Sequence, residues 1–237
     1  MRSPGAIEAH TRAYYDRIAG DYDRQLDTPQ SWEIRRHTWA VVEAMMPQRG
    51  QILDFGAGTG LDAEHFANLG HRVTAYDTSD GMIDVLRRRC AAHLAADRVA
   101  PLTGSLPRAR PALVARGPYD IVLCNFAVFS LLPRLDATFK LFGEVVRSGG
   151  AVVACMQNPW WPGEVRRRHF WRALVLTAFT GVIRYSYDGS GQSFRHTAGQ
   201  VRRAARPEFR PDPAFAAATR GGCFGSLRPM KLIVLRR

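Results

Sequence analysis

The spacing of apolar residues divides this chain into a helical start and a long alternation of strands and helices. Over residues 6–46, apolar side chains recur at helical spacing among charged ones, Gly20 predicts a break, and Ser31 is the expected cap of the second helix. Five short apolar runs, the form that buried strands take, then follow at residues 51–55, 72–76, 98–102, 119–125 and 151–156. Strands that alternate with helices in this way predict a doubly wound parallel sheet, with ligands at the carboxyl ends of its strands.

Most segments between these predicted strands carry helical signals. The sequence predicts helices over residues 61–69, 79–94 and 135–146, the second of them capped by Ser79. Residues 105–118, rich in proline and arginine, are expected to form a connector.

The pattern changes after residue 157. The expected elements are a loop at 158–163, a helix over 164–183, a strand at 183–187, a turn at 188–191, a helix capped by Thr197 and ending at Ala205, and a last strand at 230–235. No internal repeat is present.

Composition describes an ordinary globular protein. The 237 residues suffice for one large domain, 46% of them are hydrophobic and 23% charged, and no apolar run approaches the length of about 20 residues that spans a bilayer. The first residues lack the apolar core of a signal peptide. Cys90, Cys124, Cys155 and Cys223 are far apart with no CxxC pair, which argues against zinc and favours reduced thiols in a cytoplasmic protein.

The formal net charge of +12 is unevenly distributed. Residues 1–100 carry 12 basic and 14 acidic side chains, whereas residues 101–237 carry 21 basic and 7 acidic ones. An arginine-rich composition can reflect coding bias alone. It can equally reflect attraction of an acidic partner, such as a phosphorylated or carboxylated substrate, an acidic carrier protein, anionic lipid or nucleic acid.

A glycine-rich stretch at residues 52–60 follows the first predicted strand. In ILDFGAGTG, the glycines Gly56, Gly58 and Gly60 alternate with other residues after Asp54. Glycine lets a ligand approach the backbone closely, and a helix beginning there directs its first amides at that ligand. Asp77 ends the next strand, where a carboxylate can accept both hydroxyls of a ribose. Each feature alone could be a simple strand–turn–helix corner or a surface acid, but the ordered set predicts a nucleotide-like cofactor.

These motifs resemble those of the class I S-adenosylmethionine-dependent methyltransferases, especially the small-molecule branch. ILDFGAGTG is similar to their first motif, VTAYDTSDGM to the strand with the ribose-binding acid, YDIVLCNFAVF to the fourth-strand motif, and VRSGG stands where the family has a Lys-Pro-Gly-Gly turn. YDRIAGDYD, at residues 15–23, resembles their N-terminal lid signature. The resemblance covers residues 14–156 and suits the last strand.

The resemblance implies a fold and a division of the chain. The fold is a seven-stranded Rossmann-like sheet, mostly parallel with an antiparallel last strand, with a helical N-terminal segment and a lid insert after the fifth strand. The single domain of residues 1–237 would comprise an N-terminal lid (1–48), a cofactor-binding core (49–157), a substrate lid with C-terminal elements (158–229) and the last strand (230–237).

The resemblance also implies a cofactor, S-adenosyl-L-methionine, with S-adenosyl-L-homocysteine as its product, and no metal. Asp54 would receive the ammonium group, Asp77 would hold the ribose, and Tyr22 would close over the site. The other implied contacts are Gly56, Gly58 and Gly60 at the methionine part, Thr78 and Met82 beside the adenine, and Asn125 and Phe126 at the methionyl side. Ser105 stands where the family often has an acid for the adenine amino group, and is at best a substitute.

No catalytic base is predicted with a defined position. Many relatives carry histidine a few residues after the fourth strand, where this chain has Phe129. Methyl transfer from a sulfonium is an in-line displacement, so a base is required only if the acceptor keeps its proton. His196 is the best alternative base, against the interpretation of a surface histidine near a helix cap; His10 and His37 remain unranked.

The substrate class stays open among several hypotheses. The aromatic residues at 160, 161, 170 and 171 could line an apolar pocket with Arg166–Arg168 at its rim, or form the core and solvated face of the lid. The leading hypothesis is a small-molecule acceptor, anionic or lipophilic. The alternatives are an acyl group on a carrier protein, an anionic lipid, or nucleic acid, which is disfavoured because CNFAV lacks the Asp/Asn-Pro-Pro-aromatic motif. A non-catalytic binding protein is the least favoured, and the oligomeric state is not predicted.

Overall fold

The computed structural model describes residues 4–46, 48–165, 183–187, 191–219 and 228–237. Its main sheet has seven strands in the order β3-β2-β1-β4-β5-β9-β8. The first five are mutually parallel, and β9 runs antiparallel to both β5 and β8. The strands are β1 (Gln51–Phe55), β2 (Arg72–Asp77), β3 (Val99–Thr103), β4 (Tyr119–Cys124), β5 (Val146–Gln157), β8 (Arg210–Pro211) and β9 (Met230–Arg236). This topology confirms the predicted doubly wound sheet with an antiparallel last strand.

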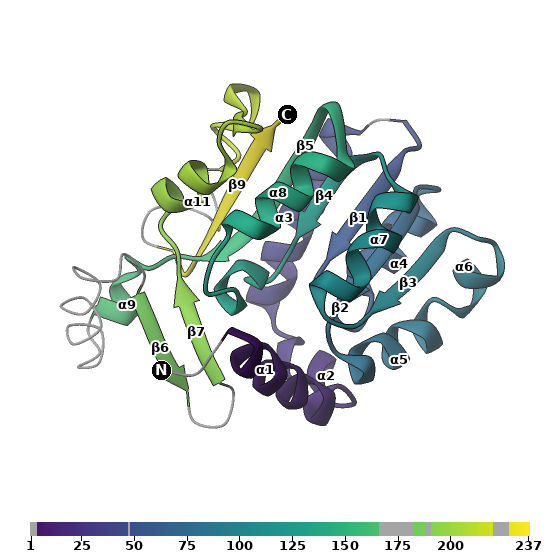
Figure 1. The fold of residues 1–237 in the computed structure, drawn as a ribbon, viewed down its shortest axis with the longest axis horizontal. Helices are drawn as coiled ribbons and strands as arrows, with labels where there is room; N and C mark the ends of the chain where they lie inside the picture. The colour runs from purple at the N-terminus through teal and green to yellow at the C-terminus, as the bar shows by residue number, and fades with distance from the viewer. Residues whose placement is uncertain (1–3, 47, 166–182, 188–190, 220–227) are drawn as a thin grey trace.

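Helices cover both faces of the sheet (Figure 1). Because strand side chains alternate between faces, Ile52 of β1 belongs to one core cluster and Leu53 to the other. One cluster includes residues of α3 (Pro29–Met45), α4 (Leu61–Asn68) and α5 (Asp80–Arg89). The other includes residues of α7 (Leu106–Arg116), α8 (Asp136–Val145) and α11 (Ala198–Ala205).

The sheet reverses its winding between β1 and β4. β1 pairs with β2 on one side and with β4 on the other, so the loops that follow β1 and β4 lead to opposite faces. Ligands of open α/β sheets bind at such a switch point. The glycine-rich stretch and Asn125 both lie there.

The prediction of a plain connector at residues 105–118 is wrong, because α7 occupies most of it. Pro107 stands in the first turn, where its missing N–H needs no partner, and Pro111 removes only one internal hydrogen bond. Burial of Ala109 and Leu113 against the core offsets that loss.

Some helix ends also differ from prediction. The cap of α3 is Thr28, whose side chain accepts the N–H of Ser31, so Ser31 itself lies inside the helix. The helix expected over residues 79–94 is interrupted at Cys90, which separates α5 from α6 (Ala91–Ala95). Ser79 caps α5 and Thr197 caps α11, as predicted.

Two further groups of elements frame the carboxyl edge of the sheet. At the N-terminus, α1 (Pro4–Ile18) and α2 (Tyr22–Leu26) precede α3, and Figure 1 shows α1 beside both α5 and β7. After β5, β6 (Ile183–Tyr187) and β7 (Gly191–Arg195) form a separate antiparallel hairpin, and the short α9 (Pro162–Val165) precedes it. The strand at 183–187 is confirmed. Most of the predicted helix over 164–183, with Arg166–Arg168, Phe170 and Trp171, and most of the turn at 188–191 lie outside the described residues.

Within the described ranges, no helix combines the length and apolar character needed to cross a membrane.

Candidate active site

The glycine-rich turn after β1 has a backbone that favours glycine at three positions. Gly56, Gly58 and Gly60 have φ values of +84°, +53° and +86°. A Cβ on Gly56 would lie 2.5 Å from Val128, and one on Gly60 would lie 2.6 Å from Leu86. On Gly58 the nearest atom would be a ring carbon of Tyr22 at 3.9 Å. Gly56 and Gly60 therefore serve packing, whereas Gly58 faces open space beneath the N-terminal helices.

Asp77 joins this turn to the end of β2. Its Oδ2 accepts the Gly58 N–H at 2.9 Å, and its Oδ1 accepts the Ser79 N–H at 2.9 Å. Burial raises the pKa of the Asp77 carboxyl, and these backbone donors oppose that rise. A carboxylate oxygen has a second lone pair, so Asp77 can still accept hydroxyl groups of a ligand above Gly58.

Asp54 lies near the end of β1, and one of its carboxyl oxygens has no hydrogen-bond partner. The side chain is 1% exposed, and Oδ2 has no hydrogen-bond partner. Burial raises the pKa of Asp54 well above its usual value, the like charge of Asp62 adds to the rise, and Arg35 opposes it. An orphaned buried carboxyl is suited to a cationic ligand group, as an ammonium would be. The residues present therefore fit the expected cofactor.

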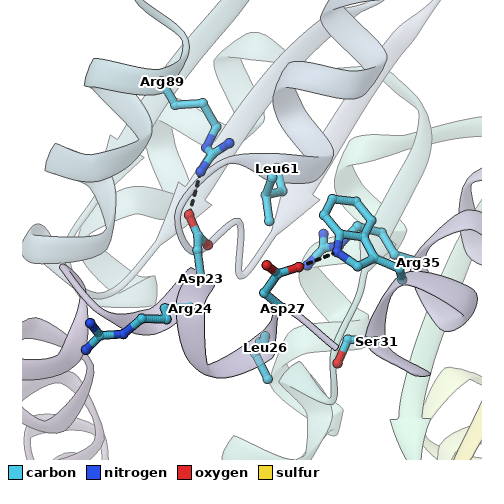
Figure 2. A pocket seen from close by; sticks show the side chains of 9 residues that line it. Asp23, Arg24, Leu26, Asp27, Ser31, Arg35, Leu61 and Arg89 are labelled. Atoms are coloured by element: carbon cyan, nitrogen blue, oxygen red, sulfur yellow. Dashed lines mark hydrogen bonds and ion pairs between the residues drawn. The ribbon is translucent and has the colours of Figure 1, made fainter. Parts of the chain in front are cut away.

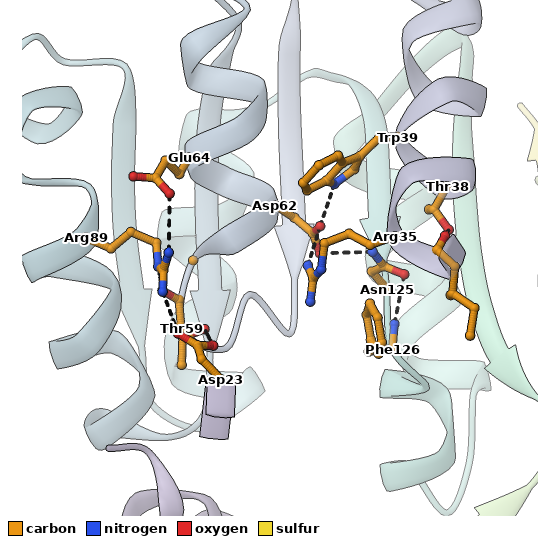
Figure 3. A network of polar contacts seen from close by, with 12 residues as sticks. Asp23, Arg35, Thr38, Trp39, Thr59, Asp62, Glu64, Arg89, Asn125 and Phe126 are labelled. Carbon is orange, nitrogen blue, oxygen red and sulfur yellow. Dashed lines mark hydrogen bonds and ion pairs between the residues drawn. The ribbon is translucent and has the colours of Figure 1, made fainter. Parts of the chain in front are cut away.

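A buried polar network links α3 to the ends of β1 and β4 (Figure 3). Asp62, in the first turn of α4, accepts N–H groups of Arg35 at 2.6 Å, Trp39 at 2.6 Å and Asn125 at 3.0 Å. The Arg35 guanidinium also lies 4.4 Å from the ring centre of Phe126. Asn125 and Phe126 thus lie at the switch point, and their contact with the methionyl part of a cofactor stays a prediction. Arg35 and Asp62, which hold them there, were not predicted.

The backbone after β4 is unusual. Phe126 and Ala127 have φ values of +49° and +66°, in the left-handed region that side chains other than glycine rarely adopt. Asn125 accepts the Phe126 N–H with its own side-chain oxygen, which helps to hold this turn. Strained backbone conformations of this kind persist only where surrounding contacts enforce them. They are concentrated at functional sites.

Two aspartates fasten the N-terminal helices over this region. Asp23 of α2 accepts the Thr59 hydroxyl at 2.5 Å and an Arg89 N–H at 2.5 Å, as Figure 3 shows for Arg89. Asp16 of α1 accepts the Ser79 hydroxyl at 2.7 Å and the Gly81 N–H at 3.0 Å, where a negative charge also suits the start of α5. With Tyr22 above Gly58, α1 and α2 lie against the turn, and their role as an N-terminal lid stays a prediction.

A cavity of about 320 Å³ lies beside this lid (Figure 2). Its walls come from α2, α3 and the segment between them, with Leu61 and Arg89 completing the lining. Gly56, Gly58 and Asp77 are not among its lining residues, so this cavity is distinct from the predicted cofactor cradle that they form.

The remaining predicted residues have varied surroundings. Met82 is 1% exposed within α5, Thr78 lies between Asp77 and the Ser79 cap, and Ser105 precedes α7 without capping it through its side chain. His196 is 3% exposed rather than on the surface, and its Nε2 lies 2.8 Å from the Leu132 carbonyl. Burial lowers the pKa of His196, so the neutral ring donates Nε2–H to that carbonyl. The structure thus gives His196 a structural partner, and its role as a base stays a prediction.

Of the two site residues that were not predicted, Arg35 has a recognisable signal in the sequence. Arg35 falls within the buried face of α3, beside Ile34, Thr38 and Val41, and a charge on an apolar stripe is a signal of a specific partner. In the part of the chain that the structure describes, no cluster of His, Cys, Asp or Glu could hold a metal ion.

Comparison with known proteins agrees with this geometry. Residues 52–150 match the family model described as a methyltransferase domain. The demethylmenaquinone methyltransferase of Renibacterium salmoninarum is 40% identical over 148 residues, which cover 62% of this chain and 59% of the relative. The corresponding enzyme of Clavibacter sepedonicus is 28% identical over 160 residues, 65% of this chain and 59% of the relative.

The solved structures include one that matches the whole chain. Burkholderia thailandensis 1,6-didemethyltoxoflavin-N1-methyltransferase, with bound 1,6-didemethyltoxoflavin and S-adenosylhomocysteine, superposes with a TM-score of 0.67. It is 17% identical and covers 100% of this chain and 91% of its own. This likeness shows the fold.

Residues 52–150 thus match a methyltransferase domain, and the chain shares its fold with a solved S-adenosylhomocysteine-bound methyltransferase. The matches to the two curated relatives span 59% of the length of each. The methyl acceptor is therefore not defined by these matches.

Proposed function

We propose that this chain transfers the methyl group of S-adenosyl-L-methionine to a small-molecule acceptor. The observation that carries the proposal is the cradle after β1, in which Gly58 donates its N–H to Asp77 and faces open space beneath Tyr22, while Asp54 at the end of β1 is buried with one oxygen unpartnered. The names of the relatives and of the solved structure, all methyltransferases of small molecules, support it.

The residues of the cradle have complementary roles in this proposal. Asp77 accepts the ribose hydroxyls, Asp54 accepts the ammonium group, and Arg35, at the same end of the cradle, binds the carboxylate. Thr78 and Met82 flank the adenine, while Asn125 and Phe126 bound the methionyl side. When bound, the cofactor supplies a methyl group that is activated by the positive sulfur.

The protein contributes to the reaction by positioning the cofactor and the acceptor and by excluding water from them. The Asp16 and Asp23 contacts hold α1 and α2 over the cradle, which confines the reactants and keeps water out. Effective molarity of this kind supplies up to about 7–11 kcal/mol of the barrier reduction in such displacements. No side chain with a free base function is required if the acceptor is already ionised.

A second candidate acceptor is an acyl group on an acidic carrier protein, or an anionic lipid. The observation in its favour is the excess of 21 basic over 7 acidic side chains in residues 101–237.

The test is calorimetric titration with S-adenosyl-L-homocysteine. The Asp77→Asn variant should bind about 10–100-fold more weakly, because hydrogen bonds to a charged group are worth about 1.5–3 kcal/mol. Asp84→Asn, an exposed acid of the neighbouring helix paired with Arg87, is the matched control and should bind as the parent does. Equal affinity of the Asp77 variant would contradict the cofactor assignment.

A further inference from the structure

Two buried threonines of the N-terminal helices differ in whether their hydroxyl groups are hydrogen-bonded. Thr38 of α3 is 0% exposed and donates to the Ile34 carbonyl, four residues earlier, at 2.9 Å. Thr11 of α1 is 7% exposed and has the Ile7 carbonyl at the same offset, yet its Oγ1 makes no hydrogen bond. A buried hydroxyl without a partner is destabilising, so Thr11 indicates a ligand that would supply one.

The position of Thr11 follows from the neighbours of α1. The carboxyl-terminal half of this helix is tied to α5, because Asp16 bonds to Ser79 and Gly81. The other main neighbour of α1 is β7 (Figure 1). Ile7 and Thr11 are the buried residues of the amino-terminal half of α1, and Figure 1 shows this half beside the hairpin.

β7 brings a buried cation to the same region. Ser193 and Arg195 are 8% and 4% exposed, and they share one face of the strand because side chains alternate. The Ser193 hydroxyl donates to the side chain of Gln157, the last residue of β5, at 3.4 Å. The face that carries Arg195 is therefore the one turned to the carboxyl edge of the sheet, where an acceptor must meet the methyl group.

We propose that Arg195 and Thr11 bind a negatively charged oxygen group of the methyl acceptor between β7 and α1. A guanidinium stays charged at all relevant pH values, and its fork of N–H groups matches a carboxylate. The Thr11 hydroxyl donates one further hydrogen bond to the same group. The inference rests on the proposed methyl transfer and deepens it, since it assigns the acceptor to the anionic class.

Matched pairs of small molecules test this site. The complex with S-adenosyl-L-homocysteine is titrated with benzoic, salicylic and hexanoic acids and with the neutral amide of each. At least one acid should bind tenfold or more tightly than its amide. Thr11→Val should reduce that preference three- to tenfold, Arg195→Met should abolish it, and Arg195→Lys should restore part of it.

Two control variants separate recognition from folding. Thr38→Val removes a hydroxyl that already has a partner, and Arg134→Met removes an arginine whose side chain is 81% exposed; both should keep the preference for the acid. If Arg195→Met does not fold, the nearly isosteric Thr11→Val decides the outcome.

Three outcomes of these titrations would contradict the proposed anion site. Equal binding of acid and amide, binding of neither, or a preference that survives in both Thr11→Val and Arg195→Met would contradict it. Binding of S-adenosyl-L-homocysteine is measured in the same samples. If the unmodified protein does not bind S-adenosyl-L-homocysteine, the proposed function is wrong. Failure of the proposed function can therefore be told apart from failure of the anion site.

Discussion

The cofactor side and the acceptor side of the sheet's carboxyl edge are built in different ways. On the cofactor side, Asp77, Asp62 and Asp23 each accept two or more hydrogen bonds, and these bonds join α2, α3, α5 and the turns after β1 and β2. On the proposed acceptor side, α1, the 3₁₀ turn η1 (Val128–Leu131) and the β6–β7 hairpin meet, and these elements are far apart in sequence. A shared cofactor thus has a pre-organised cradle, and the variable acceptor is left to distant segments.

Loss of the Arg35 charge should have the largest effect on the cofactor side. Arg35→Met leaves Asp62 buried without its cation, and removing one partner of a buried ion pair costs about 3–5 kcal/mol. Urea denaturation measures this change in the free energy of unfolding. Arg36→Met, an exposed neighbour on the same helix, should shift it by no more than about 0.5 kcal/mol. A small effect of Arg35→Met would show that the network does not organise the cradle.

Alanine at two of the glycines should separate packing from binding. Gly56→Ala places a Cβ 2.5 Å from Val128 at a φ of +84°, and overpacking of this kind costs about 1–3 kcal/mol in addition to backbone strain. Gly58→Ala has room and should lose only about 1 kcal/mol, yet its methyl group stands where the cofactor is expected. Calorimetry should therefore find weak binding of S-adenosyl-L-homocysteine to a well-folded Gly58→Ala protein. Unchanged affinity would remove Gly58 from the cradle.

The Asp23 contact should control exchange of the cofactor. Asp23→Asn weakens the bonds to Thr59 and Arg89, so α1 and α2 should separate from the turn more often. The dissociation rate of S-adenosyl-L-homocysteine should rise about tenfold or more, because a hydrogen bond to a charged group is worth about 1.5–3 kcal/mol. Stopped-flow fluorescence measures the rate. Asp21→Asn, whose exposed side chain pairs with Arg24, should leave it unchanged. An equally slow rate in Asp23→Asn would mean that the lid is held elsewhere.

The pH dependence of cofactor affinity should report Asp54. Burial and Asp62 raise its pKa, so below that raised pKa the free protein holds Asp54 protonated, and a bound ammonium group must displace the proton. Affinity should rise with pH from the ordinary carboxyl range up to the raised pKa, and then level. The free energy of unfolding should fall over the same window, because the buried carboxyl must ionise. Arg35 and Asp77 also face Asp54, so Asp54→Asn is needed to show that the slope belongs to it.

Much of the fold could be predicted from the sequence because local signals were consistent. β1 has the predicted bounds, and the Ser79 and Thr197 caps are where side-chain chemistry places them. The helix α7 was missed because its two prolines argue locally against it, while burial of Ala109 and Leu113 decides the outcome. Tertiary burial outweighs local preference there.

The candidate site likewise contains residues that local sequence signals predict and residues that only tertiary contacts define. Asp54, Asp77 and the glycines were predictable because they lie within the 24 residues from 54 to 77, in a compact motif. Arg35, Thr11 and Arg195 depend on how distant helices and strands meet, and no local spacing encodes that meeting. Their signals are charged or polar residues on buried faces, and these gain meaning only from the tertiary surroundings.

A crystal structure of the protein with S-adenosyl-L-homocysteine tests the central claim most directly. The ligand should lie above Gly56 and Gly58, with its ribose hydroxyls on Asp77 and its ammonium group within hydrogen-bond distance of Asp54. Ligand bound in the 320 Å³ cavity beside α2 and α3, without contact to Asp77, would contradict it.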